Sequence, residues 1–257
     1  MSQAPAPDLA AANDAAMAMF TRLDPKAIAL LLDVDGTIID IAPTPHEVHV
    51  SDTLCRSLAR LLDLTGGALA LVSGRPIADL DRLFSPLKLP VVGGHGAEMR
   101  LRDEHISMKS LPEKLRRQLA SATSIDSHIV IEDKGYSLAL HYRNAPQREE
   151  ELRRHIAAAC AAFPGEAIEL LPGKAMFEVK RPGVSKGEAV RALMTHAPFS
   201  GRSPVFIGDD VTDESVFALL PELGGIGFSV HRHFAGVSGI FHSPEQVRRA
   251  LQTLAGQ

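Results

Sequence analysis

The segment that most constrains the fold is a short apolar strand that ends in two carboxylates. Residues 27–32 are continuously apolar, and Asp33-Val34-Asp35-Gly36-Thr37 follows them directly. A short apolar run bounded by turn signals is typical of a strand buried on both faces of a parallel sheet. Open α/β sheets place their ligands at the carboxyl ends of such strands. Unpaired carboxylates would be costly there, which predicts a divalent cation beside Asp33 and Asp35.

Strands and helices alternate on both sides of a central interruption. Residues 68–72 and 91–92 are apolar strands, and 51–64 has the period of an amphipathic helix. The pattern resumes with a predicted helix over 185–194 and a strand over 204–207. Such alternation indicates a parallel sheet with right-handed crossovers, so the predicted fold class is α/β.

The interrupting segment has a different pattern. Predicted helices at 111–122 and 149–163 alternate with two hairpins at 129–142 and 168–180. This order indicates an antiparallel sheet covered on one side. The predicted parts of the chain are a flexible leader (1–23), a core in two segments (24–108 and 183–257) and an inserted α/β cap domain (109–182).

The composition excludes several classes of protein. The chain is 45% hydrophobic and 23% charged, and its net charge of −4 gives no sign of a nucleic-acid surface. Two cysteines, Cys55 and Cys160, cannot make a disulfide framework and indicate a reducing compartment. No apolar run reaches the length of a membrane span, and the N-terminus lacks the features of a signal peptide. We expect a cytoplasmic protein that binds neither nucleic acid nor membrane.

Further polar residues follow the other strands or begin a helix. Ser73 follows the strand at 68–72, and Lys186 lies at a helix start. An acidic cluster, Asp209, Asp210 and Asp213, follows the strand at 204–207. Because the carboxyl ends of parallel strands share one edge of the sheet, we expect these side chains to meet Asp33 there.

These residue types suit phosphoryl transfer. Mg²⁺ prefers oxygen ligands, which Asp33, Asp209 and the main-chain carbonyl of Asp35 can supply. Asp33 can act as the nucleophile that forms an aspartyl-phosphate, while Asp35 protonates the leaving alkoxide and then activates water. Ser73 and Lys186 would hold the phosphoryl oxygens. We expect Asp210 and Asp213 to support these groups indirectly rather than to bind the metal.

Each feature also has a simpler explanation. An Asp-x-Asp pair commonly forms turns, Ser73 could cap a helix, and Lys186 could be a solvated charge. A calcium-binding EF-hand loop fits poorly, because Gly36 comes two residues early and Thr44 occupies the position of the bidentate Glu. Four such elements in this order favour a catalytic site over coincident surface polarity.

The ordered set from Asp33 to Asp213 resembles the haloacid dehalogenase superfamily of phosphohydrolases. The resemblance implies a Rossmann-like parallel-sheet core with an inserted cap, and Mg²⁺ as cofactor. Smaller motifs are similar to the trehalose-6-phosphate phosphatases. These motifs are Ser73-Gly74-Arg75, Gly94-His95-Gly96-Ala97-Glu98, Gly173-Lys174, Glu178-Val179-Lys180-Arg181-Pro182 and Gly208-Asp209-Asp210-Val211-Thr212-Asp213-Glu214.

This second resemblance implies a sugar-phosphate substrate and assigns further roles. Lys174 and Glu178 match cap residues that hydrogen-bond the distal glucose, and Arg143 matches a cap residue facing the site. We also assign Arg75 and His95 to substrate binding. A trehalose-phosphate synthase is a candidate partner.

Three alternatives stay open at this point. The chain could be another sugar-phosphate phosphatase, such as one acting on sucrose phosphate. It could be a non-catalytic cation-binding domain, although the intact acidic set argues against this. Lys174 and Glu178 could simply form an ion pair on a solvated hairpin.

Overall fold

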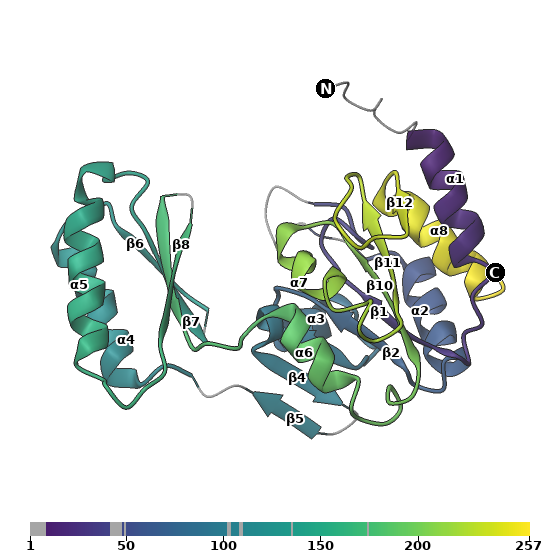
Figure 1. Cartoon of the computed structure of the whole chain (residues 1–257), viewed down its shortest axis with the longest axis horizontal. Coiled ribbons are helices and arrows are strands. Elements are labelled where there is room, and N and C mark those ends of the chain that lie inside the picture. The colour runs from purple at the N-terminus through teal and green to yellow at the C-terminus, as the bar shows by residue number, and fades with distance from the viewer. Residues whose placement is uncertain are drawn as a thin grey trace. The chain divides into compact units, whose positions relative to one another are not determined.

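The computed structural model describes residues 9–41, 48, 50–101, 104–107, 110–134, 136–173 and 175–257. The chain divides into two compact units (Figure 1). Met1–Ile106 and Ser185–Gln257 form what we call the core unit, and Ser107–Val184 form the inserted unit. None of the helices in the described ranges is both long and apolar enough to cross a membrane.

A mainly parallel sheet forms the centre of the core unit. In its described part the strand order is β12-β11-β10-β1-β2-β3-β4-β5, and every pairing from β12 to β3 is parallel. β4 pairs with β3 in the antiparallel direction. The strands are β1 (Ile28–Leu32), β2 (Leu69–Val72), β3 (Val91–Gly93), β4 (Glu98–Leu101), β5 (Glu104–Ser107), β10 (Ser203–Gly208), β11 (Ile226–Val230) and β12 (Gly239–Phe241). The predicted α/β class with a parallel sheet is confirmed.

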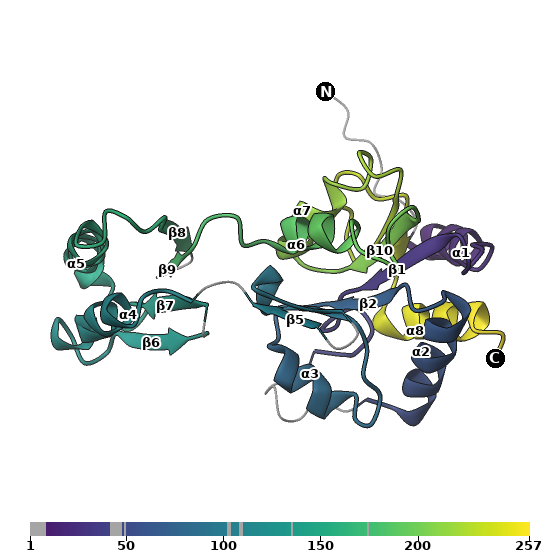
Figure 2. The ribbon, with the colours of Figure 1, turned by 90° about the horizontal axis from the view of Figure 1, so that it is seen from below.

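Helices cover both faces of this sheet (Figures 1 and 2). They are α1 (Leu9–Phe20), α2 (Asp52–Leu64), α3 (Ile77–Leu83), α6 (Lys186–Leu193), α7 (Glu214–Phe217) and α8 (Pro244–Leu254). Alternate residues of β1 point to opposite faces, as the pleat of a strand requires. Leu30 and Leu32 pack in the cluster that includes α2 and α8, whereas Ala29 and Leu31 pack in the cluster that includes α6 and α7. Burial on both faces explains the unbroken apolar run in the sequence.

The prediction of a flexible leader is wrong for residues 9–20, which form α1. Ala16 and Phe20 on this helix are fully buried, and the Phe20 ring lies 5.5 Å from the Phe228 ring and 6.0 Å from the Phe241 ring, between centroids. Both partners lie on β11 and β12, more than two hundred residues further along the chain. An alanine-rich segment has little amphipathic pattern of its own, so its order depends on this distant packing.

The inserted unit is an antiparallel sheet with helices on one face (Figure 1). Its described strands are ordered β6-β7-β9-β8, with all pairings antiparallel. The elements are α4 (Glu113–Ala120), β6 (Val130–Asp133), β7 (Ser137–His141), α5 (Glu149–Ala161), β8 (Glu169–Gly173) and β9 (Met176–Lys180). Leu138, Leu140 and Phe177 pack in one hydrophobic cluster with side chains of α4 and α5. The inserted unit therefore has a core of its own.

Candidate active site

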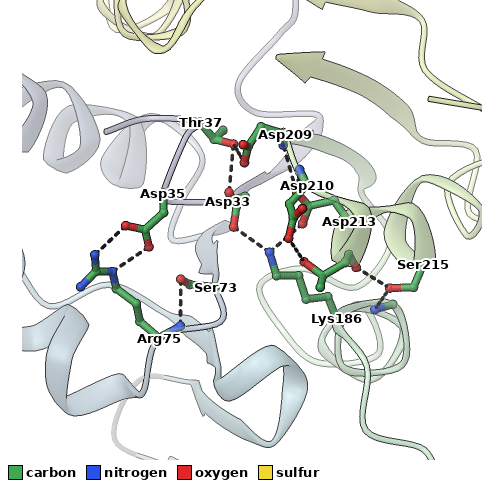
Figure 3. A network of polar contacts seen from close by, with 12 residues as sticks. Asp33, Asp35, Thr37, Ser73, Arg75, Lys186, Asp209, Asp210, Asp213 and Ser215 are labelled. Carbon is green, nitrogen blue, oxygen red and sulfur yellow. Dashed lines mark hydrogen bonds and ion pairs between the residues drawn. The ribbon is translucent and has the colours of Figure 1, made fainter. Parts of the chain in front are cut away.

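Asp33 lies at the carboxyl end of β1 and is only 4% exposed. Its amide donates to the carbonyl of Ile207 on β10 at 2.9 Å, which extends the strand pairing by one residue. The side chain then points to the sheet edge, where residues from four separate segments converge (Figure 3). The predicted convergence at this edge is therefore present in the fold.

Lys186 joins two of the buried carboxylates. Its Nζ donates to Asp33 Oδ1 and to Asp213 Oδ1, each at 2.7 Å, and the side chain is 3% exposed. Ser185 caps the helix that carries it by accepting from the amide of Glu188 at 3.1 Å. Burial alone would lower the pKa of Lys186, but the charges of Asp33 and Asp213 outweigh it and raise the pKa. Lys186 is therefore a fixed positive charge beside Asp33.

Asp209 approaches Asp33 from the other side. The Thr37 hydroxyl lies 2.9 Å from Asp33 Oδ2 and 3.2 Å from Asp209 Oδ1, so it links the two carboxylates. Burial, followed by repulsion from Asp33, raises the pKa of Asp209 to about 7. Gly36 makes the approach possible, since its φ is +78° and a Cβ there would lie 2.2 Å from Asp209 Oδ2.

Asp213 organises the loop that carries Asp209. It is completely buried, and its Oδ2 accepts from the amides of Asp209 and Asp210 at 3.0 Å each. Its Oδ1 accepts from Lys186 at 2.7 Å. Both oxygens of Asp213 are therefore already engaged by protein groups.

The acidic residues fit a divalent metal ion. Asp33, Asp209 and Asp213 each offer an oxygen, and these atoms lie within 4.8 Å of one another. Asp213 is completely buried and its Oδ2 is bonded to two loop amides, whereas Asp33 lines the cavity described below and Asp209 is partly exposed. Asp33 and Asp209 are therefore the carboxylates best placed to hold the ion. Hard oxygen donors match a hard divalent cation, and the pKa of Asp209 is raised by burial and by the charge of Asp33, both of which a bound cation would offset.

Asp35 has a partner that the sequence did not predict. Arg75 donates through Nε to Asp35 Oδ2 and through Nη2 to Asp35 Oδ1, both at 2.6 Å. The fork geometry of arginine suits such a bidentate bond to a carboxylate. The hydrogen bond with Asp35 raises the pKa of Arg75. Ser73, almost fully buried, accepts from the Arg75 amide at 3.2 Å, so one turn places Ser73 and Arg75 together.

The glycine-rich motif around His95 supports this turn. His95 has a left-handed backbone with φ 55°, and its amide donates to the Ser73 carbonyl at 3.0 Å. A Cβ on Gly74 would lie 2.4 Å from the His95 ring, so only glycine fits there. Glu98 accepts from the amide of Ile77 at 3.0 Å, at the start of α3 where Pro76 supplies no capping side chain. The two motifs thus hold each other in place.

Most of the predicted site residues of the core unit line one cavity of about 450 Å³. Those that line it are Asp33, Asp35, Ser73, Arg75, His95, Lys186 and Asp210. A second cavity of about 490 Å³ lies near the amino-terminal ends of β2 and β3, lined by residues such as Gly67, Leu89 and Pro90. It contains none of the predicted site residues, so the first cavity is the candidate active site.

The predicted sugar-binding residues belong to the inserted unit. Glu178 on β9 accepts from the Ser137 hydroxyl at 2.7 Å and forms an ion pair with Lys134 at 3.5 Å. Arg143 is exposed after the end of β7. Lys174 lies outside the residues that the structure describes. The simpler explanation, an ion pair between Lys174 and Glu178, therefore stays a prediction, and the ion pair that the structure describes for Glu178 is with Lys134.

Sequence reasoning missed two contributors to the site. Thr37 ends the first motif, where its residue type predicts no role, yet its hydroxyl links Asp33 and Asp209. Arg232, which follows β11, donates through Nε to the main-chain carbonyl of Asp209 at 3.1 Å. No sequence pattern marks Arg232, because its partner is a main-chain atom.

The core unit thus combines a parallel sheet, covered by helices on both faces, with a cluster of carboxylates and a lysine at the carboxyl edge of the sheet. Solved structures share this fold. The C-terminal domain of C. albicans trehalose-6-phosphate phosphatase aligns with a TM-score of 0.69 at 23% identity, covering 99% of each chain. Aspergillus fumigatus trehalose-6-phosphate phosphatase aligns with a TM-score of 0.67 at 22% identity, covering 99% of this chain and 100% of that one.

The sequence comparisons identify the family of the chain. The trehalose-phosphatase family model matches residues 31–248, and the chain belongs to this family. It is 39% identical over 239 residues to the trehalose-6-phosphate phosphatase of Escherichia coli, covering 87% of this chain and 88% of that protein. It is 41% identical over 229 residues to a probable trehalose-phosphate phosphatase of Sinorhizobium fredii, covering 88% of this chain and 85% of that protein. The predicted family and enzyme class are confirmed.

Proposed function

We propose that this enzyme hydrolyses trehalose 6-phosphate to trehalose and phosphate, with Mg²⁺ as cofactor and an aspartyl-phosphate intermediate. The observation that carries the proposal is the setting of Asp33. This buried carboxylate lines the cavity, bonds to Lys186 at 2.7 Å and lies beside Asp209 through Thr37. We take the proposed substrate from the activities named for the two relatives.

The reaction begins with attack by Asp33 on phosphorus. An Asp33 oxygen forms a bond to phosphorus as the bond from phosphorus to the sugar oxygen breaks, and Asp35 delivers a proton to that oxygen. Asp35 then takes a proton from water, whose oxygen attacks phosphorus and releases Asp33 and phosphate. Two displacements replace one difficult hydrolysis.

The surrounding side chains supply charge and orientation. Lys186 stays protonated beside Asp33 and would neutralise one phosphoryl oxygen, while the Ser73 hydroxyl would donate to another. When bound by Asp33 and Asp209, Mg²⁺ would offset the negative charge that these carboxylates share with the substrate. The predicted carbonyl ligand from Asp35 remains part of this proposal.

Arg75 has two possible partners in this mechanism, Asp35 and the substrate phosphate. In the structure it holds both oxygens of Asp35, and it lines the same cavity as Asp33. An incoming phosphate dianion would compete for the same guanidinium. We expect Arg75 to pass from Asp35 to the phosphate, after which the Asp35 carboxylate can take up from solvent the proton that it delivers to the sugar oxygen. His95, on the same cavity wall, would contact the substrate as well.

The inserted unit acts as the cap that selects the sugar in this proposal. A disaccharide offers many hydroxyls, and hydrogen bonds to it discriminate strongly because a wrong sugar leaves polar groups unpaired. Glu178 and Arg143 supply an acceptor and a donor, and Lys174 matches the third family position. The two free cysteines agree with a cytoplasmic location.

A synthase remains the proposed partner. A bifunctional trehalose-6-phosphate synthase/phosphatase of Thermoproteus tenax is 32% identical over 207 residues, covering 77% of this chain but 28% of that protein. That protein joins both activities in one chain, which supports a functional link between the two.

Phosphate release from a panel of sugar phosphates tests the proposed function. The panel contains trehalose 6-phosphate, sucrose 6-phosphate and glucose 6-phosphate, each with Mg²⁺ and then with a chelator. We expect trehalose 6-phosphate to be the best substrate and the chelator to abolish turnover. A preference for sucrose 6-phosphate would replace the substrate, and full turnover in chelator would remove Mg²⁺ from the mechanism.

A further inference from the structure

The main chain of Asp209 is held by side chains on both sides. Asp209 follows Gly208, the last residue of β10, so strand pairing no longer fixes it. Its amide donates to the buried Asp213 at 3.0 Å, and its carbonyl accepts from Arg232 Nε at 3.1 Å. The main chain of Asp209 is therefore held by one buried anchor and one surface anchor, beside the contact of its carboxylate with the Thr37 hydroxyl.

Arg232 is itself held in place by two further contacts. Its guanidinium carbon lies 4.8 Å from the centroid of the Phe234 ring, within the range of a cation–π contact. Its Nη2 lies 3.4 Å from Asp210 Oδ1. Phe234 is 7% exposed and stacks on Phe217 of α7 at 5.5 Å between centroids. Arg232 thus ties the loop after β10 to the packed helix that follows it.

The backbone before Arg232 turns in an unusual conformation. His231 is a non-glycine residue with φ 66°, and its amide donates to the Phe241 carbonyl at 2.9 Å. The Arg232 amide then donates to the Val230 carbonyl at 2.8 Å. A left-handed residue of this kind costs free energy and persists where the surroundings demand it. Here it leads the chain from the end of β11 toward the Asp209 loop.

We infer that Arg232 is a positioning residue that holds Asp209 in the orientation that binds the metal ion. The inference rests on the proposed function, in which Asp209 is a ligand of Mg²⁺. Arg232 acts through the Asp209 carbonyl and needs no contact with the ion or the substrate. Its planar fork can bond the carbonyl and Asp210 while its face stacks on Phe234, a combination that lysine cannot reproduce.

Charge and positioning predict opposite results when Arg232 is removed. A positive charge near a bound cation repels it, so loss of the charge alone would strengthen Mg²⁺ binding. Loss of the hydrogen bond from Arg232 to the Asp209 carbonyl would weaken Mg²⁺ binding. The sign of the change therefore separates the two effects.

Calorimetric titration of the metal-free full-length protein with MgCl₂ measures that sign. We expect Arg232→Ala to weaken Mg²⁺ binding about three- to tenfold, less than the roughly 10- to 100-fold typical of buried partners of metal ligands, because Arg232 is half exposed. Arg232→Lys should also weaken binding, since it keeps the charge but loses the fork. Saturating Mg²⁺ should restore kcat in both variants.

Arg249→Ala is the matched control. Arg249 on α8 pairs with Glu245 at 2.8 Å, and the side chains of this pair are 60% and 61% exposed, close to the 52% and 56% of Arg232 and Asp210. The control removes the same charge from a similar surface pair and should leave Mg²⁺ affinity unchanged. The rise in Tm on adding Mg²⁺ gives a second readout independent of activity.

Two outcomes contradict the inference in distinguishable ways. If the wild type binds Mg²⁺ and folded Arg232→Ala binds it as tightly or more tightly, Arg232 does not position Asp209 and the proposed function stands. If the wild type shows no Mg²⁺ binding, the proposed metal site fails and the inference fails with it.

Discussion

The core unit and the inserted unit present their proposed functional side chains in opposite ways. In the core unit, Asp33, Lys186 and Asp213 are between 0% and 4% exposed, and Lys186 donates a hydrogen bond to each carboxylate. In the inserted unit, Arg143 is exposed and the Glu178 side chain is 21% exposed on a sheet surface. Asp33 and Lys186 are therefore held by buried contacts and the more exposed Asp35 by Arg75, whereas Arg143 is open to solvent and Glu178 is partly exposed beside Ser137 and Lys134.

This difference matches the two tasks. Phosphoryl transfer depends on fixed charges at set positions, because a displacement of the reacting groups is costly in rate. Sugar recognition depends on donors and acceptors that exchange water for hydroxyl groups. The different tasks of the two sets predict that substitutions in the two units have effects of different kinds, which are given below from the largest to the smallest.

The largest effect is expected from Asp33→Asn. The substitution keeps the size and removes the nucleophilic charge, so phosphate release should fall by at least about 10⁴-fold on any phosphate ester. The measurement is initial-rate phosphate release from trehalose 6-phosphate and p-nitrophenyl phosphate, with Tm as a check of folding. Asp40→Asn, on an exposed residue paired with Arg248, should change little. More than a tenth of wild-type turnover in Asp33→Asn would exclude the aspartyl-phosphate route.

The next largest effect concerns the metal. Asp209→Ala should weaken Mg²⁺ binding by about 100-fold, because it removes one of the two available carboxylate ligands. Calorimetry and the Mg²⁺ dependence of turnover should change together. Asp63→Ala, an exposed carboxylate on α2, serves as control. An unchanged Mg²⁺ dependence in Asp209→Ala would remove this residue from the metal site.

Glu178→Ala tests the other side of the comparison. Loss of a hydrogen bond to a charged group should lower kcat/KM for trehalose 6-phosphate about ten- to a hundredfold and leave p-nitrophenyl phosphate unaffected. Glu151→Ala on α5, in a surface pair with Arg148, should affect neither substrate. Equal losses on both substrates would show that Glu178 supports the fold, through Ser137 and Lys134, rather than sugar selection.

The smallest effect is a pH dependence of stability. The pKa of Asp209 is raised to about 7 by burial and Asp33, so between about pH 4 and pH 7 the folded state binds more protons than the unfolded state. The metal-free protein should therefore lose stability as pH rises through this window. Bound Mg²⁺ removes this loss, so the Mg²⁺-induced rise in Tm should be larger at about pH 7.5 than at about pH 5.5, by a few degrees.

Melting curves with and without Mg²⁺ at these two pH values measure the effect. In the metal-free protein, Asp209→Asn has no titrating group at this position and should reduce the loss of stability between about pH 4 and pH 7. A Mg²⁺-induced shift that is the same at both pH values in the wild type would contradict the raised pKa of Asp209.

Local sequence patterns predicted much of the fold. The apolar runs at β1, β2 and β10 predicted a parallel sheet because strands buried on both faces need apolar side chains throughout. The helix α8 was not predicted, although Ser243 caps it and Pro244 begins it, and Val247, Ala250, Leu251 and Leu254 bury its inner face. Those signals were readable. By contrast, no local pattern marks α1. Its Phe20 is held by the rings of Phe228 on β11 and Phe241 on β12, which lie far along the chain.

The sequence by itself determined which groups meet at the active edge. Asp33, Ser73, Lys186 and Asp209 each follow a strand or begin a helix, and a parallel sheet brings such positions to one edge. Only the tertiary structure decided how they pair: Arg75 with Asp35, Thr37 between two carboxylates, and Arg232 on the Asp209 carbonyl. Periodicity reports which face or end a residue occupies, whereas a hydrogen bond depends on distances between segments far apart in the chain.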